Sequence, residues 1–284
     1  MVDDYDPTDD ARKCYDAAIA AKKARGDKHY PIPFSQQPWK RREVIGDCTL
    51  YLGDCRDVLP TLGKVDAVVT DPPYSDNTHK HAKTTKDKGV VNLVTFAALD
   101  DDDFRQVAKV CLSAADGWVV MTCDYRHAAL MYDDPAFVRL GAWVKPNPMP
   151  QISGDRPGQG FEAVLVLHAG RRRKAWARGG GAGIWTIPSH KGGSEVPTQK
   201  PLALAQAFVS DFTVSGETVC DPFAGSGTTG VACALMGRKF VGVEANSIHF
   251  DIACRRIAEA YKQPRLFDEP TPKPVQPSFL DQDK

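Results

Sequence analysis

Short apolar runs alternate with longer segments of helical composition from Val44 to about residue 262. The apolar runs predict strands at residues 49–52, 66–70, 117–122, 137–144, 162–167, 218–221 and 240–244. The segments between them predict helices at residues 54–62, 100–115, 125–132, 201–212, 226–236 and 248–261. Because strands alternate with helices, we expect an α/β fold in which helices cover both faces of a mostly parallel sheet.

The two ends of the chain differ from this alternating region. Residues 1–43 have the character of an N-terminal appendage, with an alanine-rich helix expected at 9–24 and prolines and basic residues after it. Residues 44–262 are expected to form one large domain. The proline-rich tail at 263–284 has the composition of a disordered segment.

The composition is that of an ordinary globular protein, with 284 residues, 42% of them hydrophobic, and a formal net charge of zero. This balance excludes a histone-like polycation but leaves room for local basic patches. None of the eight cysteines forms a Cys-x-x-Cys pair, so no metal site is expected. No apolar stretch reaches membrane-spanning length and the first residues are acidic, which predicts a cytoplasmic protein.

A glycine-rich turn follows the strand predicted at 218–221. Gly225, Gly227 and Gly230 satisfy the pattern G-x-G-x-x-G, in which glycine allows a tight turn and lets a ligand approach the backbone. Glu244 ends the next strand, where a carboxylate accepts hydrogen bonds from ribose hydroxyls. The pattern alone fits a dinucleotide, another nucleoside cofactor or a purely structural turn.

Asp221, directly before this turn, distinguishes between the ligands. A carboxylate at the tip of the strand repels a pyrophosphate, whereas it attracts the ammonium group of a methionine moiety. The segment 221–227 therefore favours S-adenosylmethionine over a nicotinamide dinucleotide.

A second motif, Asp71-Pro72-Pro73-Tyr74, follows the buried strand predicted at 66–70. The exocyclic amine of a base is a poor nucleophile because its lone pair is delocalised into the ring. The Asp71 carboxylate and the Pro72 carbonyl can each accept one N–H bond from it, and proline stiffens the turn that holds them. Tyr74 offers a face on which a base extruded from the duplex can stack. The alternative, a simple proline turn, rarely produces four such residues directly after a strand.

With these two motifs the chain resembles the S-adenosylmethionine-dependent DNA amino-methyltransferases of the β group, in which the catalytic turn precedes the cofactor turn. The resemblance covers about residues 44–262 and implies a Rossmann-like methyltransferase fold with a circularly permuted motif order. That fold has a seven-stranded, mostly parallel sheet with one antiparallel edge strand, which a hairpin of residues 137–144 and 161–167 could supply. In the family, Asp before the two prolines occurs mostly with adenine N6 and Ser mostly with cytosine N4, so Asp71 indicates adenine.

The resemblance also assigns roles to flanking segments. Asp54 is expected beside the cofactor's adenine, residues 143–147 and 161–164 beside the target base, and residues 196–201 beside the methionine end, with Val196 where many members have His. The expected catalytic residues are Asp71, Pro72, Pro73 and Tyr74. The expected cofactor-binding residues are Asp54, Cys55, Asp71, Thr198, Lys200, Asp221, Pro222, Phe223, Ala224, Gly225, Ser226, Gly227, Thr228, Glu244 and Ala245.

Two basic segments are expected to contact double-stranded DNA, one directly after the catalytic turn and one within 170–195. The residues expected to meet phosphates are Lys80, Lys83, Lys86, Lys88, Arg171, Arg172, Arg173, Lys174 and Arg178. Such contacts give affinity and salt dependence rather than sequence choice. The family inserts its target-recognition region at 170–195, and the shortness of this segment predicts a short recognition site, or help from the N-terminal appendage or from the second subunit of a homodimer.

The predicted activity is site-specific methyl transfer from S-adenosylmethionine to N6 of a flipped adenine in DNA, as in restriction-modification systems. A DNA cytosine-N4 methyltransferase is the alternative. An RNA or protein-glutamine N-methyltransferase is less expected, because those enzymes usually carry the cofactor motif first and Asn before the prolines, and this chain has neither feature. An NAD-dependent oxidoreductase is disfavoured by Asp221, and a non-catalytic DNA-binding relative by the presence of both chemical motifs.

Overall fold

A computed structural model of the chain describes residues 38–75, 98–148, 150, 154–190, 196 and 199–263. The helix expected at 9–24, the basic loop after Asp76 and the tail from residue 264 lie outside the described residues. Among the described helices, none is both long and apolar enough to cross a membrane.

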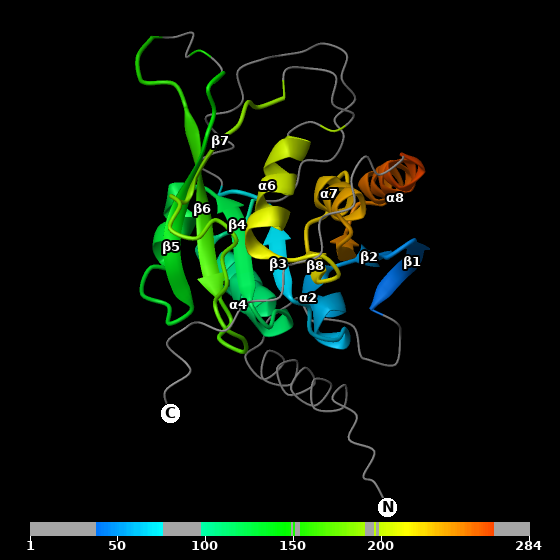
Figure 1. Cartoon of the computed structure of the whole chain (residues 1–284). Coiled ribbons are helices and arrows are strands. Elements are labelled where there is room, and N and C mark those ends of the chain that lie inside the picture. The colour runs from blue at the N-terminus through cyan, green and yellow to red at the C-terminus, as the bar shows by residue number, and fades with distance from the viewer. Residues whose placement is uncertain are drawn as a thin grey trace, which may run out of the picture.

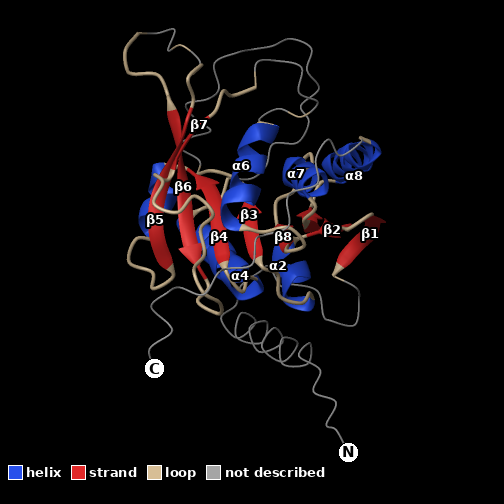
Figure 2. Ribbon diagram, in the orientation of Figure 1, coloured by secondary structure: helices blue, strands red, loops and turns tan. Residues whose placement is uncertain are grey.

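The described residues form a nine-stranded sheet in the order β1-β2-β9-β8-β3-β4-β6-β5-β7 (Figures 1 and 2). Strands β2, β9, β8, β3 and β4 run parallel, while β6 is antiparallel to both of its neighbours, β4 and β5. The strands are β1 (Trp39–Ile45), β2 (Cys48–Gly53), β3 (Ala67–Thr70), β4 (Trp118–Cys123), β5 (Phe137–Val144), β6 (Phe161–His168), β7 (Ile184–Thr186), β8 (Thr218–Asp221) and β9 (Lys239–Glu244). The predicted α/β class, the mostly parallel sheet and the antiparallel hairpin are therefore confirmed.

The sheet has two more strands than the seven expected, one at each edge. β1 pairs antiparallel with β2 and begins at Trp39, so it runs across the boundary expected at residue 43. β7 pairs parallel with β5 and lies within the segment 170–195. Neither strand is an apolar run, because β1 carries exposed charged residues and β7 is only three residues long. This composition is typical of edge strands.

Helices cover both faces of the sheet (Figure 1). One face carries α2 (Cys55–Val58), the 3-10 turn η1 (Leu59–Thr61), α4 (Asp101–Ala114) and α5 (Tyr125–Leu130). The other carries α6 (Leu202–Phe212), α7 (Thr228–Met236) and α8 (Ser247–Lys262).

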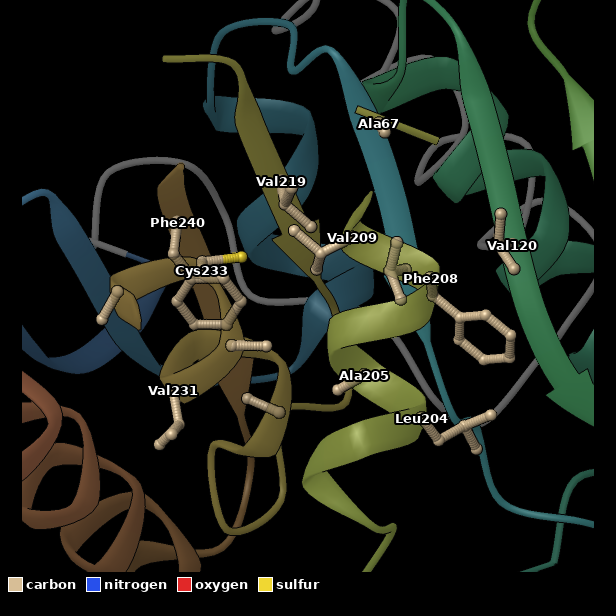
Figure 3. Close-up of a cluster of buried hydrophobic side chains, with 14 of the residues drawn as sticks. Ala67, Val120, Leu204, Ala205, Phe208, Val209, Val219, Val231, Cys233 and Phe240 are labelled. Carbon is tan, nitrogen blue, oxygen red and sulfur yellow. The ribbon is translucent and has the colours of Figure 1, made fainter. Parts of the chain in front are cut away.

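The central strands supply alternate residues to the two cores. Trp118 and Val120 of β4 pack into the core beneath α6 and α7, whereas Val119 and Met121 pack into the core beneath α4. Phe208 of α6 belongs to the first core, which Figure 3 shows in close-up. Because both faces are covered, these strands are apolar throughout, as buried parallel strands are.

Side-chain caps start three of the helices at the edge where the parallel strands end. Asp54 caps α2, Asp124 caps α5 and Asn246 caps α8, and each side chain accepts a backbone N–H of the helix it caps. The turns after β2, β4 and β9 are thereby fixed close to the ends of their strands. In open parallel sheets, ligands bind at this edge.

Candidate active site

Four carboxylates lie at the carboxyl ends of four neighbouring strands. Asp54 follows β2, Glu244 ends β9, Asp221 ends β8 and Asp71 follows β3, and these strands are consecutive in the sheet. The parallel direction of the strands brings all four residues to one edge. Positions separated by up to 190 residues in the sequence (54 and 244) therefore line a single site.

The glycine turn between β8 and α7 depends on the absence of side chains. Gly225 and Gly227 have φ angles of 52° and 78°, in the left-handed region that favours glycine. A Cβ atom on Gly227 would lie 2.8 Å from the Cβ of Ala253, and one on Gly230 would lie 2.5 Å from Cδ1 of Ile257. The first two glycines therefore set the course of the backbone, and the third allows α7 to pack closely against α8.

The Asp221 carboxylate is buried and held by hydroxyl groups. Thr70 donates to Oδ1 and Thr229 donates to Oδ2, both at 2.7 Å, and the backbone N–H of Phe223 donates to Oδ1 at 3.1 Å. Burial penalises the charged form and raises the pKa of Asp221 to about 6, although the hydrogen bonds act in the opposite direction. A cation beside this group would stabilise its carboxylate form.

Glu244 is buried as well, and each of its oxygens accepts one backbone hydrogen bond. Gly225 N donates to Oε2 and Asn246 N donates to Oε1, both at 2.8 Å. Burial raises the pKa of Glu244 against these bonds. Because a carboxylate oxygen has two acceptor sites, both oxygens can take a further donor such as a hydroxyl group.

Asp54 is held by its neighbour Arg56. The guanidinium donates from Nη2 to Oδ2 at 2.6 Å, and the backbone N–H of Arg56 donates to Oδ1 at 2.9 Å. Burial favours the neutral acid, but the hydrogen bonds from Arg56 outweigh it and lower the pKa of Asp54. The carboxylate is therefore charged and fixed in orientation.

Asp71 begins the turn expected to be catalytic and has two partners from distant segments. Lys200, just before α6, lies 2.6 Å from Oδ2 with its Nζ. Thr122, near the end of β4, donates its hydroxyl to Oδ1. The carboxylate is thus fixed between β4 and the start of α6.

Glu162 on β6 connects the turn to two lysines. The Tyr74 hydroxyl donates to its Oε2 at 2.5 Å, Lys200 Nζ lies 3.3 Å from the same oxygen, and Lys145 Nζ lies 2.5 Å from Oε1. Burial acts against the charge of Glu162, but Lys200 and Lys145 lower the pKa of Glu162 to about 2. Glu162 is therefore an ionised, largely buried carboxylate whose contacts fix the Tyr74 ring.

The structure brings together most of the residues expected to form the site. Asp71 to Tyr74, Lys200 and the segment 221–228 lie at the same edge of the sheet as Asp54 and Glu244. Cys55 begins α2 with its side chain buried in the core, and Ala245 follows β9. Among the expected site residues, those outside the described part of the chain are Thr198, Lys80, Lys83, Lys86 and Lys88.

The structure does not bring the arginines at 171 and 172 to this edge. Arg172 pairs with Asp66 at 2.8 Å and with Glu217, and these two acidic residues precede β3 and β8. Arg171 donates to the backbone carbonyls of Leu112 and Ala115. Both arginines therefore lie where the parallel strands begin, at the end of the sheet opposite to the four carboxylates. Arg173, Lys174 and Arg178, which were also expected to contact DNA, are exposed residues of the same segment, and Arg178 lies 3.7 Å from Asp211 at the end of α6.

The sequence motifs left several site residues unassigned. Thr70 and Thr122 lie at strand ends, and their polar side chains in otherwise apolar runs were the available signal. Arg256 on α8 donates to the backbone carbonyl of Ser226, a contact 30 residues apart in sequence that no local pattern marks. Among the described residues, no three His, Cys, Asp or Glu side chains gather as they would around a metal ion.

The comparison with known families shows to which family the chain belongs. A family model described as DNA methylase, of the N6/N4 type, matches residues 65–255, from just before β3 into α8. The chain belongs to the N6/N4 DNA methyltransferase family. Members of this family transfer a methyl group from S-adenosylmethionine to an exocyclic amine of adenine or cytosine.

Two curated DNA methyltransferases are similar over most of the chain. The chain is 26% identical over 266 residues to the type II methyltransferase M.HinfI of Haemophilus influenzae. The matched region covers 78% of this chain and 72% of that protein. It is 29% identical over 269 residues to the type II methyltransferase M.XycI of Xanthomonas campestris pv. cyanopsidis. This match covers 75% of this chain and 89% of that protein.

Solved structures of DNA methyltransferases share the fold. The complex of M1.HpyAVI with S-adenosylmethionine superposes with a TM-score of 0.54 at 26% identity and covers 74% of this chain and 99% of that one. The cytosine-N4-specific PvuII DNA methyltransferase superposes with a TM-score of 0.60 at 17% identity, over 78% and 95% of the two chains. These likenesses confirm the methyltransferase fold and S-adenosylmethionine as the cofactor of the family.

Proposed function

We propose that this DNA methyltransferase transfers the methyl group of S-adenosylmethionine to N6 of an adenine flipped out of double-stranded DNA. The observation that carries the proposal is Asp71 at the end of β3, next in the sheet to β8 and its Asp221. A carboxylate that could accept hydrogen bonds from the target amine thus lies at the end of one strand, and a carboxylate that could attract a cationic cofactor lies at the end of the next.

The cofactor is proposed to lie across the ends of four strands. Asp54 would accept the adenine amine, Glu244 the ribose hydroxyls, and Asp221 would face the ammonium group. The geometry of Glu244 supports this, since both oxygens retain an acceptor site. The backbone of the glycine turn, with its left-handed Gly225 and Gly227, would pass close to the cofactor. When bound, the cofactor supplies an electrophilic methyl group.

The residues of the catalytic turn are proposed to act on the target amine. The Asp71 carboxylate and the Pro72 carbonyl would each accept one N–H, which directs the nitrogen lone pair toward the methyl carbon. Tyr74 would stack on the flipped base, because its hydroxyl is already fixed by Glu162. Catalysis by these residues is then alignment of the amine and stabilisation of its developing positive charge.

The choice of adenine rests on one residue. The chain has Asp71 before the two prolines, which in the family occurs mostly with adenine targets. Cytosine N4 is the second candidate, since a structural neighbour, the PvuII enzyme, is described as cytosine-N4-specific. For DNA contacts we propose the exposed Arg173 and Lys174, together with the lysines that directly follow the catalytic turn in the sequence, Lys80, Lys83, Lys86 and Lys88.

The test is a methylation assay with nucleoside analysis. Unmethylated plasmid DNA is incubated with the protein and methyl-labelled S-adenosylmethionine, digested to nucleosides and separated by mass spectrometry. The expected product is N6-methyladenine at one short sequence, located by modification-sensitive sequencing. N4-methylcytosine would move the assignment to the second candidate, and label that enters only RNA or protein would overturn the proposed function.

A further inference from the structure

Lys200 contacts the two side chains that are proposed to bind the target base, Asp71 and Tyr74. Its Nζ is 2.6 Å from Oδ2 of Asp71 and 5.2 Å from the centroid of the Tyr74 ring. The first contact is an ion pair with the carboxylate that would accept the target amine. The second is a cation–π contact on the ring that would stack with the base.

The neutral amine of a base competes poorly for this carboxylate. Thr122 already donates to Oδ1 of Asp71, and a full positive charge pairs with Oδ2. Hydrogen bonds to a charged donor are about twice as strong as those to a neutral one. Lys200 also draws electron density from the acceptor that has to activate the amine. Methyl transfer is therefore expected to need the separation of Lys200 from Asp71.

A second carboxylate, that of Glu162, lies close to Lys200. Glu162 Oε2 lies 3.3 Å from Lys200 Nζ, and the Glu162 side chain is only 15% exposed. Lys145 pairs with the other oxygen, Oε1, at 2.5 Å, so the carboxylate is anchored while Oε2 faces Lys200. Lys200 is thus already ion-paired with both carboxylates. A small rotation of its side chain would release Asp71 and keep the pair with Glu162, so that the ammonium is not left unpaired.

We propose that Lys200 holds the place of the target amino group on Asp71 and moves to Glu162 when the base enters. Glu162 is then a positioning residue, because it acts on the reaction through Lys200 and Tyr74 and does not touch the base. This inference rests on the proposed function, since it needs an amine that competes for Asp71.

The experiment measures single-turnover methylation of plasmid DNA at saturating labelled S-adenosylmethionine. Glu162→Gln keeps the size and the hydrogen-bond acceptor but removes the charge that attracts Lys200. It is expected to slow methyl transfer about 10- to 100-fold, while the Kd for S-adenosylmethionine stays within about twofold. Glu162→Asp, which keeps the charge, is expected to retain the rate within about fivefold. Glu217→Gln is the matched control, because Glu217 is also ion-paired and 15% exposed but lies at the opposite edge of the sheet.

The decisive variant adds Lys200→Met to Glu162→Gln. If Lys200 blocks Asp71, its removal restores part of the lost rate, and the double variant is at least about threefold faster than Glu162→Gln alone. A double variant that is as slow as or slower than Glu162→Gln alone overturns the inference, because removing Lys200 then does not free Asp71 for the amine. An active wild type with an equally active Glu162→Gln also overturns it and leaves the proposed function intact. A wild type that methylates no DNA overturns the proposed function itself, and the inference with it.

Discussion

The guanidinium of Arg256, on α8, donates to the backbone carbonyl of Ser226 at 2.6 Å. Ser226 lies between the two left-handed glycines of the glycine turn after β8, and its side-chain oxygen accepts a hydrogen bond from the same Nη1 at 2.8 Å. A charged donor on a long helix thus holds a turn whose glycines give it little stiffness of its own.

Arg256→Met is expected to weaken S-adenosylmethionine binding about tenfold, because a hydrogen bond from a charged group contributes roughly 1.5–3 kcal/mol. Isothermal titration calorimetry measures the change in Kd. The control is Arg255→Met, the neighbouring arginine, whose side chain is 47% exposed and pairs with Glu259 along the helix. Equal affinities for the two variants would mean that the turn keeps its shape without Arg256.

Asp71→Ala is expected to reduce methyl transfer by about three orders of magnitude or more, since it removes the acceptor that aligns the amine. The Kd for S-adenosylmethionine should change little, because Asp221, Glu244 and Asp54 remain. Single-turnover methylation and calorimetry on the same preparation separate the two effects. Loss of cofactor binding with Asp71→Ala would show that the amine and cofactor sites have been misassigned.

The affinity for S-adenosylmethionine is expected to rise as the pH increases through about 6. Asp221 has a pKa of about 6 because burial favours its neutral form, and only the carboxylate attracts a cation. Below that value each pH unit should weaken binding up to about tenfold, because a proton must leave before the cation is held. Calorimetry at pH 5, 6 and 7 measures this slope. Asp221→Asn should bind more weakly with a flat profile, and an unchanged slope in that variant would assign the titration to another group.

Gly230→Ala is expected to lower the free energy of unfolding by about 1–3 kcal/mol, as overpacking of a core does. A Cβ there would lie 2.5 Å from Cδ1 of Ile257 and 2.8 Å from the Phe240 ring. Urea denaturation followed by circular dichroism gives the value. Gly63→Ala is the control, since nothing lies within 4 Å of its Cβ position. If the two variants are equally stable, α7 and α8 can separate at no cost.

Arg172→Met and Arg173→Met are expected to behave differently. The first removes the ion pairs with Asp66 and Glu217 and should lower the free energy of unfolding by about 1 kcal/mol, a modest value because the arginine is 35% exposed. The second should leave stability unchanged and reduce the salt dependence of DNA binding by about one phosphate contact. Fluorescence anisotropy on a DNA duplex at several salt concentrations measures the slope. A smaller slope for Arg172→Met as well would give that residue a DNA contact in addition to its ion pairs.

The central sheet could be predicted because its strands are apolar throughout. The strand at 218–221 begins and ends at the expected residues, and all of its side chains after the first are buried. The strand at 137–144 also matches, although only Trp143 in it is buried, because valine and aromatic residues mark it as a strand. The edge strands β1 and β7 could not be found in this way. Their stability comes from pairing with β2 and β5, and the sequence of an edge strand carries little trace of its partner.

The site was predictable where a motif is local and contiguous. The turns beginning at Asp71 and Asp221 each contain their functional groups within a few residues. Contacts between distant segments were not predictable, such as Tyr74 with Glu162, 88 residues apart, and Arg172 with Asp66, 106 residues apart. Arg172 also shows why charge alone is a weak guide, because a basic run in sequence can be divided between internal ion pairs and solvent.

The order β2-β9-β8-β3 also sets a length requirement for whatever binds at this edge. Neighbouring strands are about 4.8 Å apart, so the four strand ends span roughly 14 Å. In the proposed placement of the cofactor, a nucleoside alone would reach only the ends of β2 and β9, and an amino acid alone would reach only β8. Only a molecule that joins the two can contact the whole row and present its reactive carbon next to Asp71. With this placement, the row of strand ends would discriminate among adenosine compounds by how far they extend, before any chemistry takes place.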